Sequence, residues 1–224
     1  MGVVLLVRHG QASFGADDYD VLSEVGWEQS RLLGAYLAAR DVVPDVVLRG
    51  DMRRHRETAE GMLEGAGWAS AIEEDRGWDE FDHLGVVARL PDLPDDRELD
   101  NRGFQQVFEQ ATARWASGQH DDDYPESFPT FRGRVVEALA RAGERAGSGS
   151  TVLVVTSGGP IAAACGSLVG PADADAPTHY SLWGGFNTVV VNTSVTRVVV
   201  GSAGRRLLTF NEHPHLEADH LTYR

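Results

Sequence analysis

The order of apolar runs along the chain predicts an α/β protein with a mixed, mainly parallel central sheet and helices on both of its faces. Runs 3–7 and 151–155 are short, apolar and rich in β-branched residues, which is typical of buried strands. Segments with apolar residues at helical spacing separate the early runs, whereas only turns separate the last ones. The first arrangement favours parallel strands, and the second favours hairpins.

In the first third of the chain, strands and helices are expected to alternate. Ser23 is a candidate N-cap with Glu24 in the first turn of the helix that follows. Residues 46–48 predict a second buried strand, and a second helix is expected to open near residues 50–51. Residues 71–72 predict a further short strand.

The middle of the chain has a different composition. Residues 76–102 are rich in Gly, Pro and Asp and predict a long irregular segment. Two helices are then expected, one with an apolar face that ends at Trp115 and one that starts near Ser127. Between them, residues 118–126 contain three successive aspartates and predict a solvated loop.

Three apolar runs close the chain after the strand at 151–155 and the helix that opens at its end. The turns between these runs predict hairpin strands at 188–191, 195–200 and 207–210. No repeat and no linker is evident, so one domain over residues 1–224 is expected.

The composition excludes several classes of protein. With 42% hydrophobic and 24% charged residues, the chain is typical of a globular protein, and no apolar run is long enough for a membrane span. No signal peptide is evident, so a cytoplasmic location is expected. The net charge of −14 disfavours nucleic acid and anionic membranes as partners. All 20 basic residues are arginines, which excludes lysine Schiff-base chemistry, and the lone Cys165 excludes an internal disulfide.

The end of the first strand carries the most specific chemical signal. Arg8, His9 and Gly10 follow directly on the apolar run, at the edge where open α/β sheets bind ligands. Imidazole can attack phosphorus, and one guanidinium group can donate hydrogen bonds to two phosphate oxygens at once. Glycine allows the chain to turn sharply. The three residues together predict a phosphoryl-transfer site. A strand-end turn with a surface histidine is the alternative.

Two further strand ends offer suitable groups. The second strand is followed by four consecutive cation-capable residues, 53–56, of which one or two can face the first strand end. The strand at 151–155 leads into Ser157, Gly158 and Gly159 at a helix start, where backbone N–H groups attract anions. Ser157 is not a serine-hydrolase nucleophile, because Val155 stands where the nucleophile elbow needs glycine.

Over nearly its whole length the sequence resembles the histidine phosphatase superfamily, which includes the cofactor-dependent phosphoglycerate mutases. Residues 22–34 are similar to the family's first helix. Residues 50–59 are similar to its second arginine motif, where arginine stands four residues before threonine, which selects Arg54. The segment that ends at Glu80 resembles the one that carries the family's acidic residue. The resemblance implies a phosphoglycerate mutase-like fold, with an excursion at about 76–127 over the active site.

The resemblance also implies roles. The histidine, here His9, is phosphorylated, and Glu80 is proton donor and then base, without a metal or other cofactor. Taken from the residues alone, a solvated carboxylate among other acids is the favoured interpretation of Glu80. The remaining candidates are phosphate-binding: Arg8, Arg54, Ser157 and Gly158, with Gln11 and His83 as further possibilities.

Ser157 is a departure from the family pattern, which usually has histidine at this position. Serine donates a hydrogen bond but carries no charge, and loss of a charge-assisted bond costs roughly 1.5–3 kcal/mol. His83 lies three residues after Glu80 and is a candidate replacement; His213 and His215 are less well placed. An exposed loop histidine is the alternative for each.

The expected function is a phosphoric monoester hydrolase of the histidine acid phosphatase type, acting on a small phosphorylated molecule through a phosphohistidine. A phosphoglycerate mutase-type isomerase and a catalytically weak relative that binds a phosphorylated ligand or partner are the alternatives, and a homodimer is left open. Four aromatic residues either line an apolar substrate pocket or belong to the core: Phe14, Tyr19, Trp78 and Phe81.

Overall fold

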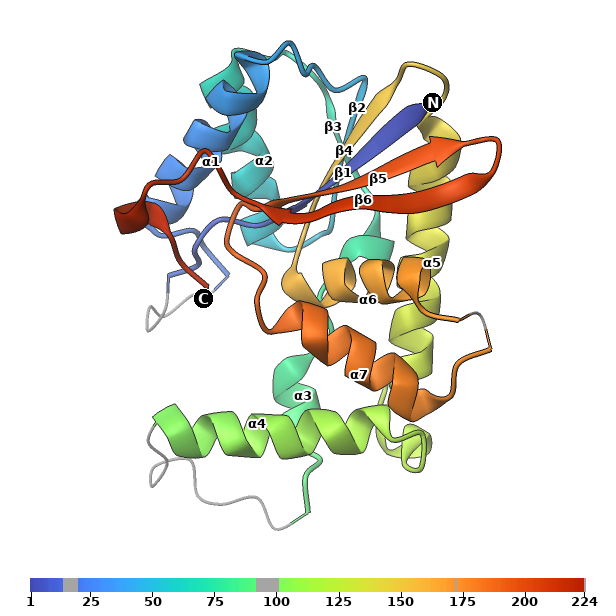
Figure 1. Cartoon of the computed structure of the whole chain (residues 1–224). Coiled ribbons are helices and arrows are strands. Elements are labelled where there is room, and N and C mark those ends of the chain that lie inside the picture. The colour runs from blue at the N-terminus through green and yellow to red at the C-terminus, as the bar shows by residue number, and fades with distance from the viewer. Residues whose placement is uncertain (14–19, 92–100, 172, 224) are drawn as a thin grey trace.

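The computed structural model describes residues 1–13, 20–91, 101–171 and 173–223 (Figure 1). Its centre is one six-stranded sheet with the strand order β3-β2-β4-β1-β5-β6. The inner strands pair in parallel, and the last two are antiparallel, so the predicted fold class is confirmed. The strands are β1 (Gly2–Arg8), β2 (Val46–Arg49), β3 (Ile72–Glu74), β4 (Thr151–Thr156), β5 (Val195–Gly201) and β6 (Gly204–Glu212).

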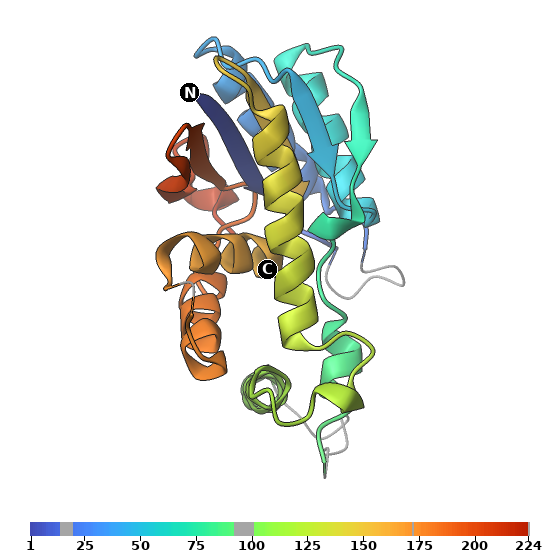
Figure 2. The same ribbon diagram turned by 90° about the vertical axis from the view of Figure 1, so that its right-hand side faces the viewer.

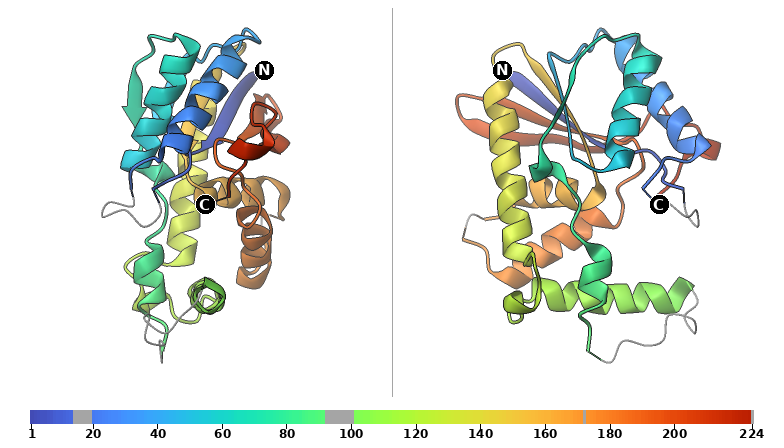
Figure 3. Two further views of the ribbon diagram at one scale, coloured as in Figure 1. Left: turned by 90° about the vertical axis from the view of Figure 1, so that its left-hand side faces the viewer. Right: turned by 180° about the vertical axis from the view of Figure 1, so that it is seen from behind.

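Helices cover both faces of the sheet (Figures 1 and 3). Alternate residues of β1 point to opposite faces, so that Leu5 packs on one side with Leu33 and Met62, while Leu6 packs on the other with Phe131. The first layer contains α1 (Glu24–Ala38) and α2 (Arg53–Ala66). The second contains α5 (Phe128–Arg145) and α6 (Gly158–Val169), with α7 (Ala176–Asn187) packed on α6.

The helix starts follow local capping chemistry. Ser23 and Ser127 cap α1 and α5 as predicted, and each side chain accepts a hydrogen bond from a backbone N–H of the first turn. By contrast, α2 begins at Arg53, a little later than expected, after Met52, which makes no side-chain cap bond. The four cation-capable residues 53–56, here called the basic run, therefore occupy the first turn of α2, next to the end of β2.

The segment expected to be irregular at 76–102 contains short helices. They are η1 (Arg76–Trp78) and α3 (His83–Val87), and residues 92–100 lie outside the described part of the chain. The predicted helix that ends near Trp115 is α4 (Asn101–Ala116), which lies away from the sheet in Figure 2. The loop at 118–126 includes one turn, η3 (Asp121–Asp123). The rings of Trp115 and Phe81 stack with centroids 4.6 Å apart, which fastens α4 to the segment that follows η1.

The predicted strand at 188–191 is wrong. Thr188 ends α7, which the apolar pattern did not reveal, and the following residues form a buried connection to β5. Val190 and Val191 belong to the core, but the Val191 N–H donates to the Asn211 side chain at 2.8 Å instead of to a neighbouring strand. Burial alone thus accounts for the apolar run. The hairpin expected from the last two runs is confirmed as β5–β6.

The C-terminal segment returns to the end of β1 after η4 (Ala218–His220). Its backbone is held by the N–H of Asn192, which donates to Thr222 at 2.9 Å, and by the Gln29 side chain, which donates to His220 at 2.7 Å. These bonds place Tyr223 beside Arg8, at the carboxyl end of β1. Within the described residues, no helix is both long and apolar enough to cross a membrane.

Candidate active site

A cavity of about 200 Å³ opens beside the carboxyl ends of β1 and β4. The two strands pair in register, with Arg8 opposite Thr156, so the residues that follow them emerge side by side. The wall residues come from both helical layers, from the segment after η1 and from the C-terminus. They are Arg8, His9, Arg54, Glu80, Phe81, His83, Phe108, Gly158, Asn187 and Tyr223.

His9 is held as a neutral ring. It is 6% exposed, and its Nδ1 lies 2.7 Å from the Gly10 carbonyl oxygen. A carbonyl can only accept, so Nδ1 carries the proton and Nε2 keeps its lone pair. Burial, together with Arg54 and Arg8, lowers the pKa of His9 well below its ordinary value of 6.5. The ring is therefore neutral at neutral pH, with an unprotonated Nε2.

The turn after His9 is fastened to both helices of the first layer. The Gly10 N–H donates to the Thr58 hydroxyl at 2.9 Å, and that hydroxyl donates to the Arg54 carbonyl at 2.7 Å. A Cβ on Gly10 would lie 2.4 Å from the carbonyl oxygen of Gly26 in α1, so no larger residue fits without a backbone shift. These contacts fix the orientation of the imidazole relative to Arg54.

Two arginines face the cavity. Arg54, in the first turn of α2, is 6% exposed and pairs with Asp20 through Nη1 at 2.7 Å. Arg8 ends β1 and donates to the carbonyl oxygens of Val190 and of Tyr223, the latter at 3.0 Å. The backbone of the C-terminal segment thus helps to position the Arg8 guanidinium.

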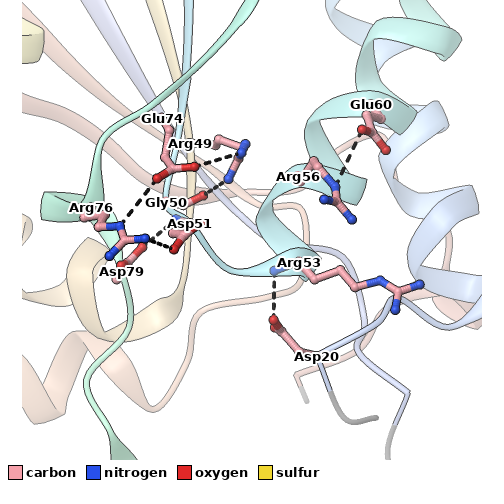
Figure 4. A network of polar contacts seen from close by, with 10 residues as sticks. All are labelled: Asp20, Arg49, Gly50, Asp51, Arg53, Arg56, Glu60, Glu74, Arg76 and Asp79. Atoms are coloured by element: carbon pink, nitrogen blue, oxygen red, sulfur yellow. Dashed lines mark hydrogen bonds and ion pairs between the residues drawn. The ribbon is translucent and has the colours of Figure 1, made fainter.

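The two other arginines of the basic run, Arg53 and Arg56, do not line the cavity. Arg53 pairs with Glu57 at 2.7 Å, and Arg56 lies 3.8 Å from Glu60 on the outer face of α2 (Figure 4). Successive helical residues point about 100° apart, so only part of the run can face the strand ends. The divergence expected from the sequence is present, with Arg54 on the inner side.

Glu80 reaches the cavity from the segment after η1. Its oxygens accept the backbone N–H groups of Gly159 and Phe81, each at 3.1 Å. Burial raises the pKa of Glu80 above its ordinary value, against the opposing effects of the Gly159 N–H and of Arg54. A Cβ on Gly159 would lie 2.1 Å from the carboxyl group, so a larger residue there would displace the Glu80 side chain from this position. A carboxyl group with a raised pKa keeps its proton to higher pH, which is the property that a general acid needs.

Hydrogen bonds from the sheet and from α5, together with burial of Trp78, hold the segment that carries Glu80 in place. Trp78 is fully buried, and its carbonyl accepts the Thr156 hydroxyl at 2.5 Å. Arg134 of α5 donates to the Asp79 carbonyl at 2.7 Å. Trp78 therefore belongs to the core, whereas Phe81 both packs in the core and lines the cavity. The other two aromatic candidates, Phe14 and Tyr19, lie outside the described residues.

Two predicted phosphate ligands do not line the cavity. Ser157 is 1% exposed, and its hydroxyl lies 2.7 Å from Nε2 of His55. The Gln11 side chain accepts the Ser23 hydroxyl at 2.9 Å. By contrast, Gly158 lines the cavity, and so does His83, the first residue of α3. Burial and Arg54 lower the pKa of His83, which opposes a permanent cationic role for it in the empty site.

Sequence reasoning missed several residues that lie in or behind the cavity. Asn187 belongs to the unpredicted helix α7, for which Asp175, the N-cap, and Pro177 near the helix start were available signals. Tyr223 reaches the cavity only through long-range hydrogen bonds, for which no local signal exists. His55 was treated as a member of the basic run and not as a buried group.

The assembled groups suit phosphoryl transfer. A neutral imidazole faces a space flanked by two guanidinium groups, and a carboxyl group with a raised pKa completes the wall. Guanidinium groups bind phosphate oxygens, imidazole attacks phosphorus, and the acid can protonate a leaving oxygen. Among the described residues, no cluster of three or more His, Cys, Asp or Glu side chains is arranged to hold a metal ion.

Comparison with known proteins agrees with this geometry. Residues 4–213 match the sequence model of the histidine phosphatase superfamily (branch 1). No curated protein matches the sequence. Among solved structures, YhfR of Bacillus stearothermophilus is similar with a TM-score of 0.68 and 22% identity, over 96% of this chain and 99% of that one.

Two similar structures are phosphatases by name. Phosphoserine phosphatase of Entamoeba histolytica, solved as a mutant with phosphoserine, has a TM-score of 0.69 and 16% identity, over 97% of this chain and 100% of that one. Mycobacterial glucosyl-3-phosphoglycerate phosphatase, solved with inorganic phosphate, has a TM-score of 0.63 and 21% identity, with 97% and 100% covered. At such identities the likeness shows the fold alone.

Proposed function

Because this chain belongs to the histidine phosphatase superfamily (branch 1), we propose that it is a phosphomonoesterase that hydrolyses a small phosphorylated molecule through a phosphohistidine. The observation that carries the proposal is the pairing of a neutral His9 with Glu80, whose pKa is raised, across one cavity that Arg8 and Arg54 also line. The lowered pKa of His9 suits a nucleophile and the raised pKa of Glu80 suits an acid, so the opposite shifts indicate which group has which role. The two named phosphatases that share the fold give further support.

The first half-reaction transfers the phosphoryl group to the protein. Nε2 of His9 attacks phosphorus, a P–N bond forms, and the P–O bond to the substrate breaks. Glu80 gives its proton to the departing oxygen, so the alcohol leaves neutral. Arg8 and Arg54 hold the non-bridging oxygens, whose charge is spread over the transition state.

The second half-reaction releases phosphate. Glu80, now a carboxylate, takes a proton from a water molecule, and the water oxygen attacks phosphorus. The P–N bond breaks, the electron pair returns to Nε2, and Glu80 is again protonated. One water is consumed, and one alcohol and one phosphate leave.

A panel of phosphorylated metabolites, together with p-nitrophenyl phosphate, tests the proposed function. Phosphate release is followed for the wild type and for His9→Ala side by side. We expect release by the wild type alone from at least one compound. Folded wild-type protein that releases phosphate from none of them would contradict the proposal.

Replacement of Arg54 is expected to weaken the binding of orthovanadate far more than replacement of Arg53. Arg54→Ala removes a charge-assisted bond to phosphate, worth roughly 1.5–3 kcal/mol, so the inhibition constant for orthovanadate should rise about ten- to a hundredfold. Arg53→Ala is the matched control, because Arg53 pairs with Glu57 outside the cavity, and it should change the constant less than about threefold. Equal effects of the two substitutions would show that the wrong arginine is assigned.

The pH dependence of kcat/KM should be bell-shaped with an acidic optimum. The lowered pKa of His9 keeps the ring neutral below pH 6.5, and activity falls only when acid protonates it. The raised pKa of Glu80 keeps the acid protonated above pH 4.5, and activity falls as alkali ionises it. Glu80→Gln should remove the alkaline limb; a limb that persists unchanged in this variant would belong to another group.

A further inference from the structure

The reaction described above leaves one titratable group beside His9 unused. His55 lies in the first turn of α2 and is fully buried, and its ring centroid is 5.9 Å from that of His9. Its Nε2 lies 2.7 Å from the Ser157 hydroxyl, at the end of β4. Neither residue lines the cavity, so the pair lies directly behind the nucleophile.

The Ser157 hydroxyl can satisfy His55 in both of its charge states. A hydroxyl group donates one hydrogen bond and accepts two. It donates to Nε2 when the ring is neutral with the proton on Nδ1, and it accepts from Nε2–H when the ring is charged. Protonation of His55 therefore leaves no new unsatisfied donor on this side, although the group is buried.

The other ring nitrogen faces backbone. A Cβ on Gly50 would lie 2.4 Å from Nδ1 of His55, and the Gly50 backbone favours the protonated ring. Asp79 lies on the same side of Gly50, with its Oδ1 2.7 Å from that Cβ position; this oxygen accepts the Asp51 N–H at 2.6 Å, and burial raises the pKa of Asp79. By strict geometry Nδ1 has no hydrogen-bond partner among the described residues, although the nearby Gly50 backbone raises the pKa of the ring.

Burial and the cationic neighbours together keep the His55 ring neutral when no phosphoryl group is bound. Burial is the main cause that lowers the pKa of His55, and Arg54 and Arg49 lower it further. A bound phosphoryl dianion acts in the opposite direction, because it offsets the guanidinium charges of the cavity. At an effective dielectric constant of about 20 and a separation of about 7 Å, one negative charge shifts a protonation equilibrium roughly fiftyfold.

We infer that the His55–Ser157 pair takes up one proton from solvent when a phosphoryl group occupies the cavity, so that His55 becomes a third positive charge behind His9. The proton returns to solvent when phosphate leaves. This inference rests on the proposed function and assigns His55 as a positioning residue that acts through its charge. It also accounts for serine at position 157, where a hydroxyl accommodates both states of the ring.

The charge state of His55 can be measured directly. Two-bond ¹H–¹⁵N spectra of the eight histidine side chains, recorded near pH 7 with and without saturating orthovanadate, distinguish neutral from charged rings, and His55→Gln assigns the signal. We expect His55 to change from neutral to doubly protonated on vanadate binding. His215 is an internal control, because burial lowers its pKa to about 4 and it lies outside the cavity, so it should stay neutral.

The possible results separate the two proposals. A vanadate complex in which the His9 signals shift but His55 stays neutral would overturn this inference alone. Absence of any vanadate effect on His9 would contradict the proposed function, and the inference would fall with it.

Kinetics of phosphohistidine formation supply a second readout. His55→Gln keeps a hydrogen bond to Ser157 but not the charge, and should slow the step about ten- to a hundredfold. Ser157→Ala should leave His55 neutral in the vanadate complex, because Nε2–H would lose its acceptor. The double variant His55→Ala/Ser157→His moves the imidazole to the end of β4 and should be faster than His55→Ala. An unchanged rate in folded His55→Gln would refute the inference.

Discussion

Replacing His9 with alanine should abolish the hydrolysis of every phosphomonoester that the wild-type protein accepts. The substitution removes the atom that forms the P–N bond, and the remaining groups of the cavity only bind and polarise. Loss of a covalent nucleophile lowers turnover by on the order of 10⁴-fold or more. Initial rates of phosphate release, measured at saturating substrate, check this expectation.

The control is a histidine that plays no part in the site. His120 is exposed, and His120→Ala should retain wild-type turnover. If His9→Ala, shown to be folded by circular dichroism, keeps more than about one tenth of the wild-type rate, His9 is not the nucleophile.

Replacing Glu80 with glutamine should lower kcat by about 10²- to 10⁴-fold for alkyl phosphates, which is the typical contribution of a general acid. Glutamine is close in size and can still accept the Gly159 N–H, so the binding of substrate should change little. The loss should be much smaller for p-nitrophenyl phosphate in the phosphorylation step, because its leaving group needs no proton. Rapid-quench measurements of phosphohistidine formation with both substrates separate these cases.

Glu60→Gln is the matched control for Glu80→Gln. Glu60 is an exposed acid on α2 that lies 3.8 Å from Arg56 and does not line the cavity. It should change kcat by less than about fivefold. An equal loss for the alkyl and the p-nitrophenyl substrate in Glu80→Gln would show that Glu80 does not protonate the leaving group.

The sequence was sufficient to predict the strands that build the site and the groups at their ends. Runs of β-branched residues mark β1, β2 and β4, and parallel strands place their carboxyl ends at one edge, so Arg8, His9 and Gly158 could be expected together. Arg54 was selected by the resemblance to the family's second arginine motif, because the residues alone left open which of 53–56 faces the strand ends. Local patterns carried these predictions because each depends on residues that are close in the chain.

Other parts of the site depend on contacts between distant segments. His55 is buried against Ser157, 102 residues away in the chain, and nothing in the run 53–56 distinguishes it from its solvated neighbours. Tyr223 is placed by hydrogen bonds of its neighbours to residues near 29 and 192. The apolar residues at 188–191 suggested a strand because burial, and not pairing, determines their composition.

Trapping the phosphorylated intermediate tests the central claim most directly. The wild type is mixed with a substrate identified in the panel, quenched within milliseconds in alkali, which preserves a phosphohistidine, and digested for mass spectrometry. We predict one phosphoryl group on an imidazole nitrogen of His9, stable to base, labile to acid and absent from His9→Ala. An active protein whose phosphoryl group is found on another residue, or which turns over substrate with none on His9, would contradict the account.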